Sequence, residues 1–206
     1  MKYELQHDHN TDTFFLDFYI PKSLWEQYPY KVTAFSRGLL DFKNTTKGPL
    51  WSDYTIELLC AVSKLVNDTP SGIKSAYLAC VPSSDPDGRT TMINSIKMIT
   101  DLYVDGTAAA FTDCKKPLID ASGLFIRTKQ IRSSHMCAVR GEPRPTIAEH
   151  LDTLSIRPGY YPQDALFIIM DDIVTRGNSL WACRKLLLDA GIYKSSIRLL
   201  AFGKTI

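Results

Sequence analysis

The last third of the chain has the clearest alternation of apolar and polar positions. An unbroken apolar run at 166–170 predicts a buried strand, and apolar residues at helical spacing over 179–191 predict a helix that Gly191 closes. A further strand is predicted over 197–202. Strand, helix and strand in this order form a βαβ unit, with parallel strands and a right-handed crossover. This unit indicates an α/β fold.

The middle of the chain repeats the alternation. Apolar residues at helical spacing predict a helix over 51–66 that Ser52 can cap, and the short apolar run 75–81 predicts a buried strand that stops at Pro82. A returning helix and two short strands are expected further on, over 90–103, 108–111 and 124–128. We therefore expect a mainly parallel central sheet flanked by helices.

Two stretches lack a regular period. Residues 14–43 mix aromatic and β-branched residues around prolines, which predicts strands and turns. We therefore expect 1–50 to form a small N-terminal β-rich hood beside a core domain at 51–206. The polar stretch 129–145 is rich in Arg, Ser and Pro, which is typical of a long surface loop, and such loops in compact domains often carry function.

The composition narrows the class of protein. The chain has 206 residues, of which 45% are hydrophobic and 22% charged, as in a soluble single domain. Lys and Arg exceed Asp and Glu by only 24 to 22, so no large uniform field favours nucleic acid. Five cysteines without a Cys-x-x-Cys pair argue against a disulfide framework or a zinc ribbon. Because the sequence lacks a signal-peptide pattern and an apolar run of roughly 18 residues, we expect a cytoplasmic protein with no membrane partner.

Two acids follow the apolar run at 166–170. Asp171 and Asp172 at the end of a buried strand are unfavourable unless a polar ligand or a cation faces them. In open parallel sheets, ligands bind at the carboxyl ends of strands. The next residues, 175–179, combine hydroxyl groups, Gly177 and a helix start, which together can form a cradle for an anion. Carboxylates for sugar hydroxyls beside a phosphate cradle match the two ends of a ribose 5-phosphate.

The segment LFIIMDDIVTRGNS, residues 166–179, resembles the phosphoribosyl pyrophosphate (PRPP) binding signature of type I phosphoribosyltransferases. That signature has four or five apolar residues, two acids and then Thr-x-Gly-x-Thr/Ser. The resemblance implies the type I phosphoribosyltransferase fold, in which Asp171 and Asp172 hold the ribose hydroxyls and serve as metal ligands. It also implies that the 5-phosphate is bound by the residues that follow, Val174, Thr175, Arg176, Gly177, Asn178 and Ser179.

A weaker likeness extends upstream and points to the competence-protein ComF-like branch of the family. It is carried by the strand end CVPSS, by the helix start at Gly88 and Arg89, and by Arg127. In that branch the loop after the first core strand contacts pyrophosphate, which implies this role here for Val81, Pro82, Ser83 and Ser84. The cysteine-rich zinc ribbon that the branch normally carries near its start is lacking in this sequence.

The resemblance implies a Mg²⁺-dependent enzyme that transfers the phosphoribosyl group of PRPP to a nitrogen nucleophile, such as a nucleobase, and releases pyrophosphate. Displacement of pyrophosphate develops charge on the sugar and on the leaving group, so we expect Mg²⁺ and cationic side chains to stabilise it. The loop at 129–145 is long enough to close over the site. The cations available for pyrophosphate are Arg127, Lys129, Arg132 and Arg140. The family often forms homodimers.

Other interpretations stay open. Some proteins of this fold keep the PRPP pocket without turnover, so a non-catalytic PRPP- or nucleotide-binding regulatory protein is an alternative. A Walker B segment would need a P-loop, and the sequence contains no Gly-x-x-x-x-Gly-Lys-Ser/Thr. A purely structural alternative places the two acids in a turn and makes Ser179 a helix cap. Nucleic-acid binding through Arg132 and Arg140 is a further alternative, which the net charge does not favour.

Overall fold

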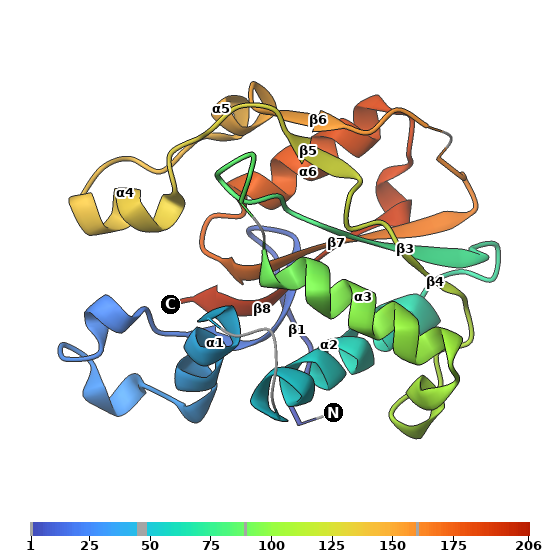
Figure 1. Cartoon of the computed structure of the whole chain (residues 1–206), viewed down its shortest axis with the longest axis horizontal. Helices are drawn as coiled ribbons and strands as arrows, with labels where there is room; N and C mark the ends of the chain where they lie inside the picture. Colours follow the sequence, from blue (N-terminus) through green and yellow to red (C-terminus); the bar gives the residue numbers. More distant parts are fainter. Residues whose placement is uncertain (1, 45–48, 89, 160) are drawn as a thin grey trace.

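A mostly parallel six-stranded sheet lies at the centre of the computed structural model, which describes residues 2–44, 49–88, 90–159 and 161–206 (Figure 1). The strand order is β1-β2-β8-β7-β3-β4; β1 is antiparallel to β2, and the other neighbours are parallel. The strands are Gln6–Asp8 (β1), Thr13–Tyr19 (β2), Ser75–Cys80 (β3), Leu118–Asp120 (β4), Ala165–Val174 (β7) and Ile197–Thr205 (β8). A second, antiparallel sheet joins Phe125–Arg127 (β5) to Leu154–Ile156 (β6).

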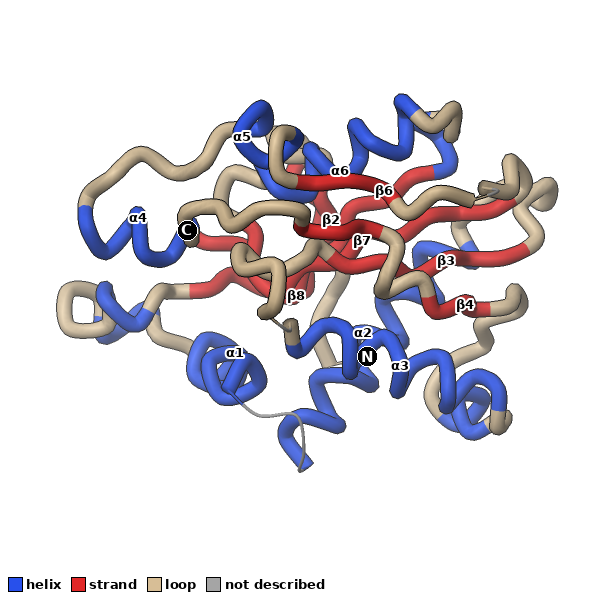
Figure 2. The backbone as a smooth tube through the Cα atoms, turned by 45° about the horizontal axis from the view of Figure 1, so that its top comes forward, coloured by secondary structure: helices blue, strands red, loops and turns tan. Residues whose placement is uncertain are grey.

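Helices cover both faces of the central sheet (Figure 2). The helices are Ala34–Asn44 (α1), Pro49–Asn67 (α2), Thr91–Val104 (α3), Ser134–Arg140 (α4), Ile147–Leu151 (α5) and Asn178–Asp189 (α6). Helices α1, α2 and α3 lie on one face, while α6 and the small β5-β6 sheet lie on the other (Figure 1). Short 3₁₀ helices span Lys22–Leu24, Pro29–Lys31, Thr107–Ala110 and Lys194–Ser196. In the described part of the chain, no helix combines the length and apolar character needed to cross a membrane.

The central strand β7 is buried on both faces, which explains its unbroken apolar run. Leu166, Ile168 and Met170 pack toward α1, α2 and α3, whereas Phe167 and Ile169 pack toward α6. All five side chains have no exposed surface. A parallel strand that is covered on both sides needs apolar residues at every position rather than at alternate ones.

The structure confirms the mainly parallel sheet between helices and several of its expected elements. The elements expected over 51–66, 75–81, 90–103 and 197–202 correspond to α2, β3, α3 and β8. Helix α2 begins at Pro49, so Ser52 lies inside the helix and does not cap it. The helix expected over 179–191 begins at Asn178 and is followed by Gly191, which adopts a φ of 87°.

The expectation of a β-rich hood is wrong. Strands β1 and β2 belong to the central sheet, where β2 pairs in parallel with β8. Much of the rest of 14–43 is helical, because Phe35, Leu39 and Phe42 recur at helical spacing and are buried against α2. Thr33 starts α1 by accepting a hydrogen bond from the backbone N–H of Ser36, at 3.2 Å.

Two further expectations need correction. The strand expected over 108–111 is a 3₁₀ helix instead, with Gly106 before it at a φ of 81° and only Ala108 buried within it. The neighbouring edge strand is β4, whose three residues are too few to give a clear pattern. The stretch 129–145 is not an unstructured loop, since it contains α4, which ends at Arg140 and is followed by Gly141 in the left-handed conformation.

Candidate functional site

The candidate site lies where the chain leaves β3 and β7 in opposite directions. From β3 the chain passes through α3 to β4, and from β7 it passes through α6 to β8, on the other side and over the other face of the sheet. The carboxyl ends of β3 and β7 therefore form a topological switch point, where open α/β sheets bind their ligands. The two strand ends are in register, because the N–H of Val81 donates to the carbonyl oxygen of Met170 at 2.9 Å.

Asp171 and Asp172 lie inside β7, not in a loop after it, because β7 continues to Val174 beside β8. Both side chains are half-buried. The Asp171 carboxylate accepts a hydrogen bond from the N–H of Asp172 at 2.9 Å, and the Asp172 carboxylate accepts one from the N–H of Ile173 at 2.6 Å. Val174 is buried among the side chains under α6 and pairs with Lys204 of β8, so the structure gives it almost no exposed surface for a ligand.

The thiols below Asp171 are buried and neutral. Burial, and then the charge of the Asp171 carboxylate, raises the pKa of Cys80 to about 12, and the same two causes raise the pKa of Cys183. Neither cysteine can supply a thiolate nucleophile at neutral pH under these conditions. Chemistry at this strand end therefore falls to the carboxylates and hydroxyls.

Two hydroxyl groups of the expected phosphate cradle are already engaged by the protein. The Ser179 hydroxyl donates to the Asp171 carboxylate at 3.3 Å, and the Thr175 hydroxyl lies 2.9 Å from that of Thr205. The first contact joins the start of α6 to the carboxylates of β7. The expected phosphate cradle and the two acids are therefore in direct contact, as their short separation in the sequence predicts.

Gly177 forms the turn between β7 and α6. Its φ of 72° lies in the left-handed region, which glycine adopts without a steric penalty. The first helical hydrogen bond runs from the N–H of Trp181 to the carbonyl of Gly177 at 2.8 Å, so the N–H groups just before Trp181 lie at the open helix start. Such N–H groups, at the positive end of the helix dipole, can bind a phosphate.

The turn at Gly177 is held from two sides. A side chain added at Gly177 would meet Thr11 at 3.3 Å and Trp181 at 3.4 Å. The Asn178 amide donates to the carbonyl of Pro145 at 2.8 Å, which fastens the end of the 129–145 stretch to the start of α6. Arg176, between these anchors, points its side chain to solvent.

The loop after β3 is positioned by Arg127, whose side chain is 5% exposed. Its Nε donates to the carbonyl of Ser83 at 3.0 Å and its Nη1 donates to the Thr153 hydroxyl at 2.6 Å. Burial lowers the pKa of Arg127, but the ordinary value of an arginine is so high that the charge is kept. The structure thus places Arg127 behind Pro82, Ser83 and Ser84, where it holds the loop for which the resemblance implies a contact with pyrophosphate.

The other cations of the 129–145 stretch lie farther out. Arg132 pairs with Glu149 at 2.7 Å, while Lys129 and Arg140 are exposed. The N–H of Ile131 donates to the carbonyl of Ser84 at 3.0 Å, so this stretch begins in direct contact with the loop after β3. A hollow of about 240 Å³ opens beside that contact, between Ser84 and α4. Arg89, which the sequence also links to this region, lies outside the described residues.

The donor set fits a magnesium ion that arrives with its substrate. Across the described ranges, no three His, Cys, Asp or Glu side chains are grouped so as to hold a metal ion by themselves. Asp171 and Asp172 provide two adjacent carboxylates at the strand end. Mg²⁺ is commonly bound by one or two carboxylates together with substrate phosphates and water, so even one of these carboxylates, with a substrate, could complete such a site.

The stability of the protein is expected to fall between about pH 6.5 and about pH 4 because of His150, which lies behind Arg127. Burial, and then repulsion from Arg127, lowers the pKa of His150 from 6.5 to about 4. Above pH 6.5 the imidazole is neutral in both states. Below it, the unfolded chain takes up a proton that the folded chain takes up only near pH 4, so the free energy of unfolding falls, by on the order of 3 kcal/mol.

Urea unfolding at several pH values measures this effect, and the substitution His150→Gln should remove most of it. The carboxylate of Asp8 has a pKa of about 2, lowered from 3.8, so its contribution to stability is lost only below pH 3.8. That loss therefore lies outside the pH range in which His150 acts. An equal pH dependence in the His150→Gln variant would show that other groups cause the loss.

Sequence reasoning missed the contacts that flank the cradle. Thr11 and Thr205 come from opposite ends of the chain and touch the turn at Gly177 and Thr175. Neither belongs to a motif, so no local signal could have identified them. In comparisons with known proteins, no protein-family model matches the chain, and no curated protein matches it either.

Proposed function

We propose that the chain binds PRPP at the carboxyl ends of β3 and β7 and transfers its phosphoribosyl group to a nitrogen nucleophile such as a nucleobase. One observation carries the proposal. Two adjacent carboxylates, a left-handed glycine turn and the open start of α6 follow one another at a topological switch point, and the Ser179 hydroxyl links them. We infer from the same geometry that the fold is that of the type I phosphoribosyltransferases.

Each part of PRPP has a matching part of the site. The carboxylates of Asp171 and Asp172 can accept hydrogen bonds from the two ribose hydroxyls. The backbone N–H groups at the start of α6 can donate to the 5-phosphate. The hydroxyls of Thr175 and Ser179 can do so as well once they leave their contacts with Thr205 and Asp171. The loop after β3, which Arg127 holds from behind, lies beside these acids and can face the pyrophosphate.

The transfer needs little covalent chemistry from the protein. The lone pair of the acceptor nitrogen forms a bond to C1 of the ribose, the bond from C1 to the pyrophosphate oxygen breaks with its electrons on oxygen, and the nitrogen loses its proton to solvent. The role of the site is to align these atoms and to stabilise the charge that develops on the sugar and the leaving group. When bound, Mg²⁺ supplies additional positive charge at the pyrophosphate.

Calorimetric titration with PRPP in the presence of Mg²⁺ tests the proposal. Saturable binding that is weakened by EDTA is expected, and ribose 5-phosphate should bind more weakly because it lacks the pyrophosphate. Release of pyrophosphate on addition of individual nucleobases would then identify the acceptor. Binding without release for any base would favour the regulatory alternative, and absence of PRPP binding would contradict the proposal.

A further inference from the structure

A second polar hollow lies at the other end of α6, away from the candidate PRPP site. It measures about 650 Å³ and opens between the β1-β2 hairpin, the 3₁₀ helix Lys194–Ser196 and the start of β8. Its walls include His7, Asp12, Phe14, Arg184, Lys194 and Arg198. Arg198 lies three residues before Ala201, the β8 partner of Asp171, so the hollow and the acids are about 10 Å apart along β8.

Positive charge dominates this hollow. Arg184, Lys194 and Arg198 face a single carboxylate among the described wall residues, that of Asp12. Lys194 is exposed, and its ammonium group makes no hydrogen bond or ion pair with the described residues. An excess of cations around a concave surface attracts anions.

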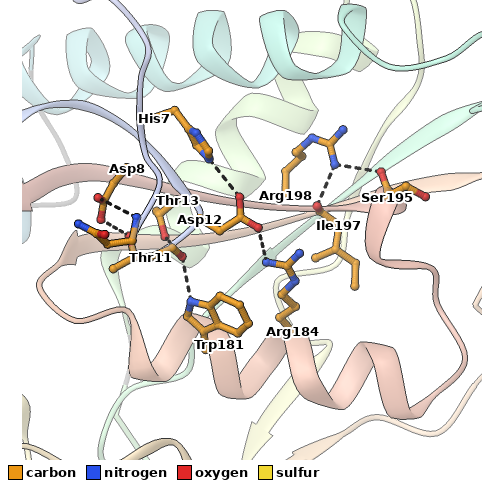
Figure 3. A network of polar contacts seen from close by, with 11 residues as sticks. His7, Asp8, Thr11, Asp12, Thr13, Trp181, Arg184, Ser195, Ile197 and Arg198 are labelled. Carbon is orange, nitrogen blue, oxygen red and sulfur yellow. Dashed lines mark hydrogen bonds and ion pairs between the residues drawn. The ribbon is translucent and has the colours of Figure 1, made fainter.

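Arg184 is the unusual member of the group, because a guanidinium is rarely buried. Its side chain is 3% exposed, and its Nη1 donates to the Asp12 carboxylate at 2.7 Å. Its Nε is buried and has no hydrogen-bond partner within the described chain. Figure 3 shows Arg184 and His7 pointing at Asp12 from opposite sides.

The carboxylate of Asp12 cannot by itself neutralise this group. Burial acts to raise the pKa of Asp12, but hydrogen bonds from Arg184 and His7 outweigh it and hold the pKa below its ordinary value. The carboxylate is therefore charged at neutral pH, and its one negative charge is shared between Arg184 and the ring of His7, at 2.7 Å and 3.1 Å. No carboxylate of the hollow neutralises the positive charges of Lys194 and Arg198, so these charges can attract an anionic ligand.

Arg198 presents part of its guanidinium in a fixed orientation. Its Nη1 donates to the carbonyls of Ser195 and Ile197, at 2.9 and 3.0 Å (Figure 3). Its Nε and Nη2 make no hydrogen bond to any residue that the structure describes. A guanidinium that is held on one side and open on the other can donate a pair of hydrogen bonds to a phosphate.

We propose that this hollow binds a small phosphate ester, with the phosphate at Lys194 and Arg198. The rings of His7 and Phe14, whose centroids are 4.5 Å apart, and the exposed ring of Tyr193 line the same space. Aromatic walls beside a phosphate group favour a ligand that carries a planar ring, so a nucleoside monophosphate fits better than inorganic phosphate. This binding does not depend on the activity proposed above.

A chain of direct contacts connects the residues of the hollow to the start of α6. Trp181 donates from its indole Nε1 to the carbonyl of Thr11 at 2.9 Å, and the guanidinium of Arg184 lies 4.9 Å from the centre of the Trp181 ring. Thr11 in turn contacts the position of Gly177. A ligand in the hollow is therefore expected to change the fluorescence of Trp181, which gives a binding signal from the site itself.

The test uses the full chain with Trp25 and Trp51 replaced by Phe, so that Trp181 reports alone. Titration with AMP should give a saturable fluorescence change, and inorganic phosphate should bind more weakly. The substitutions Lys194→Gln and Arg198→Gln together should raise the Kd for AMP by at least about 10-fold, because charge-assisted contacts to the phosphate are lost. The control pair Lys64→Gln and Lys97→Gln removes the same charge from exposed positions on α2 and α3 and should leave the Kd unchanged.

Several outcomes would overturn the inference. They are the absence of saturable AMP or phosphate binding by the parent protein, and AMP affinity that the Lys194→Gln and Arg198→Gln pair does not change. Equal affinity for AMP and phosphate would keep the phosphate site and overturn the role of the rings. Thermal unfolding of the variant excludes a folding defect, and the single substitution Lys194→Gln repeats the test without disturbing the Arg198 contacts. PRPP binding should survive in the variant, so the two proposals fail independently.

Discussion

Replacing Asp171 and Asp172 together by Asn is expected to raise the Kd for PRPP by about 100-fold or more. Each carboxylate is proposed to accept a charge-assisted hydrogen bond from a ribose hydroxyl, and such bonds contribute about 1.5–3 kcal/mol each. An amide oxygen can still accept the hydrogen bonds from the N–H groups of Asp172 and Ile173, so the fold should persist. Calorimetric titration with PRPP and Mg²⁺ measures the change.

A control must separate the loss of these particular carboxylates from the loss of two negative charges. The pair Asp53→Asn and Asp101→Asn changes the net charge equally at exposed positions on α2 and α3. This control should bind PRPP like the parent protein. If both pairs weaken binding to the same extent, the effect is one of overall charge, and Asp171 and Asp172 have no special role.

The substitution Gly177→Ala is expected to weaken PRPP binding by at least about 10-fold and to lower the free energy of unfolding by about 1–2 kcal/mol. The stability loss follows from the φ of 72°, since a side chain in the left-handed region costs about this much. The binding loss has a second cause. The new methyl group would press on Thr11 at 3.3 Å and shift the turn that presents the N–H groups of α6.

The opposite end of the same helix offers a matched control. Gly191 has a φ of 87°, but no atom lies within 4 Å of the place where its side chain would be. Gly191→Ala should therefore lose similar stability and keep its affinity for PRPP. Chemical denaturation and PRPP titration of both variants make the comparison, and equal losses of affinity would mean that the Gly177 turn does not form the phosphate cradle.

The sequence was informative where a single segment determines the structure. The run at 166–170 has to be apolar because both faces of β7 are buried, and Gly177 sits at a turn that requires a left-handed backbone. Both features could be predicted from neighbouring residues alone. The order of acids, turn and helix along the chain was predicted for the same reason.

The features that the sequence did not predict depend on contacts between segments that are far apart in the chain. The acids were expected where the strand ends, but β8 runs alongside as far as Thr205, so the strand continues past Asp171 and Asp172 to Val174. Arg127 was expected to meet the substrate, whereas the fold turns its Nε and Nη1 to Ser83 and Thr153, which lie elsewhere in the chain. Helix α1 was missed because two of its buried residues, Phe35 and Phe42, are aromatic, and aromatic residues also suit strands.

The pairing of β2 with β8 bears on the order in which the chain can fold. Thr13 pairs with Leu199 and Tyr19 with Thr205, so residues near the start of the chain bond to residues near its end. Contacts of such large sequence separation slow folding, because the entropy of closing the loop is lost before the contacts form. During synthesis, β2 leaves the ribosome long before its partner strand exists. Until β8 is made, the backbone N–H and C=O groups of β2 that face it have no strand to pair with.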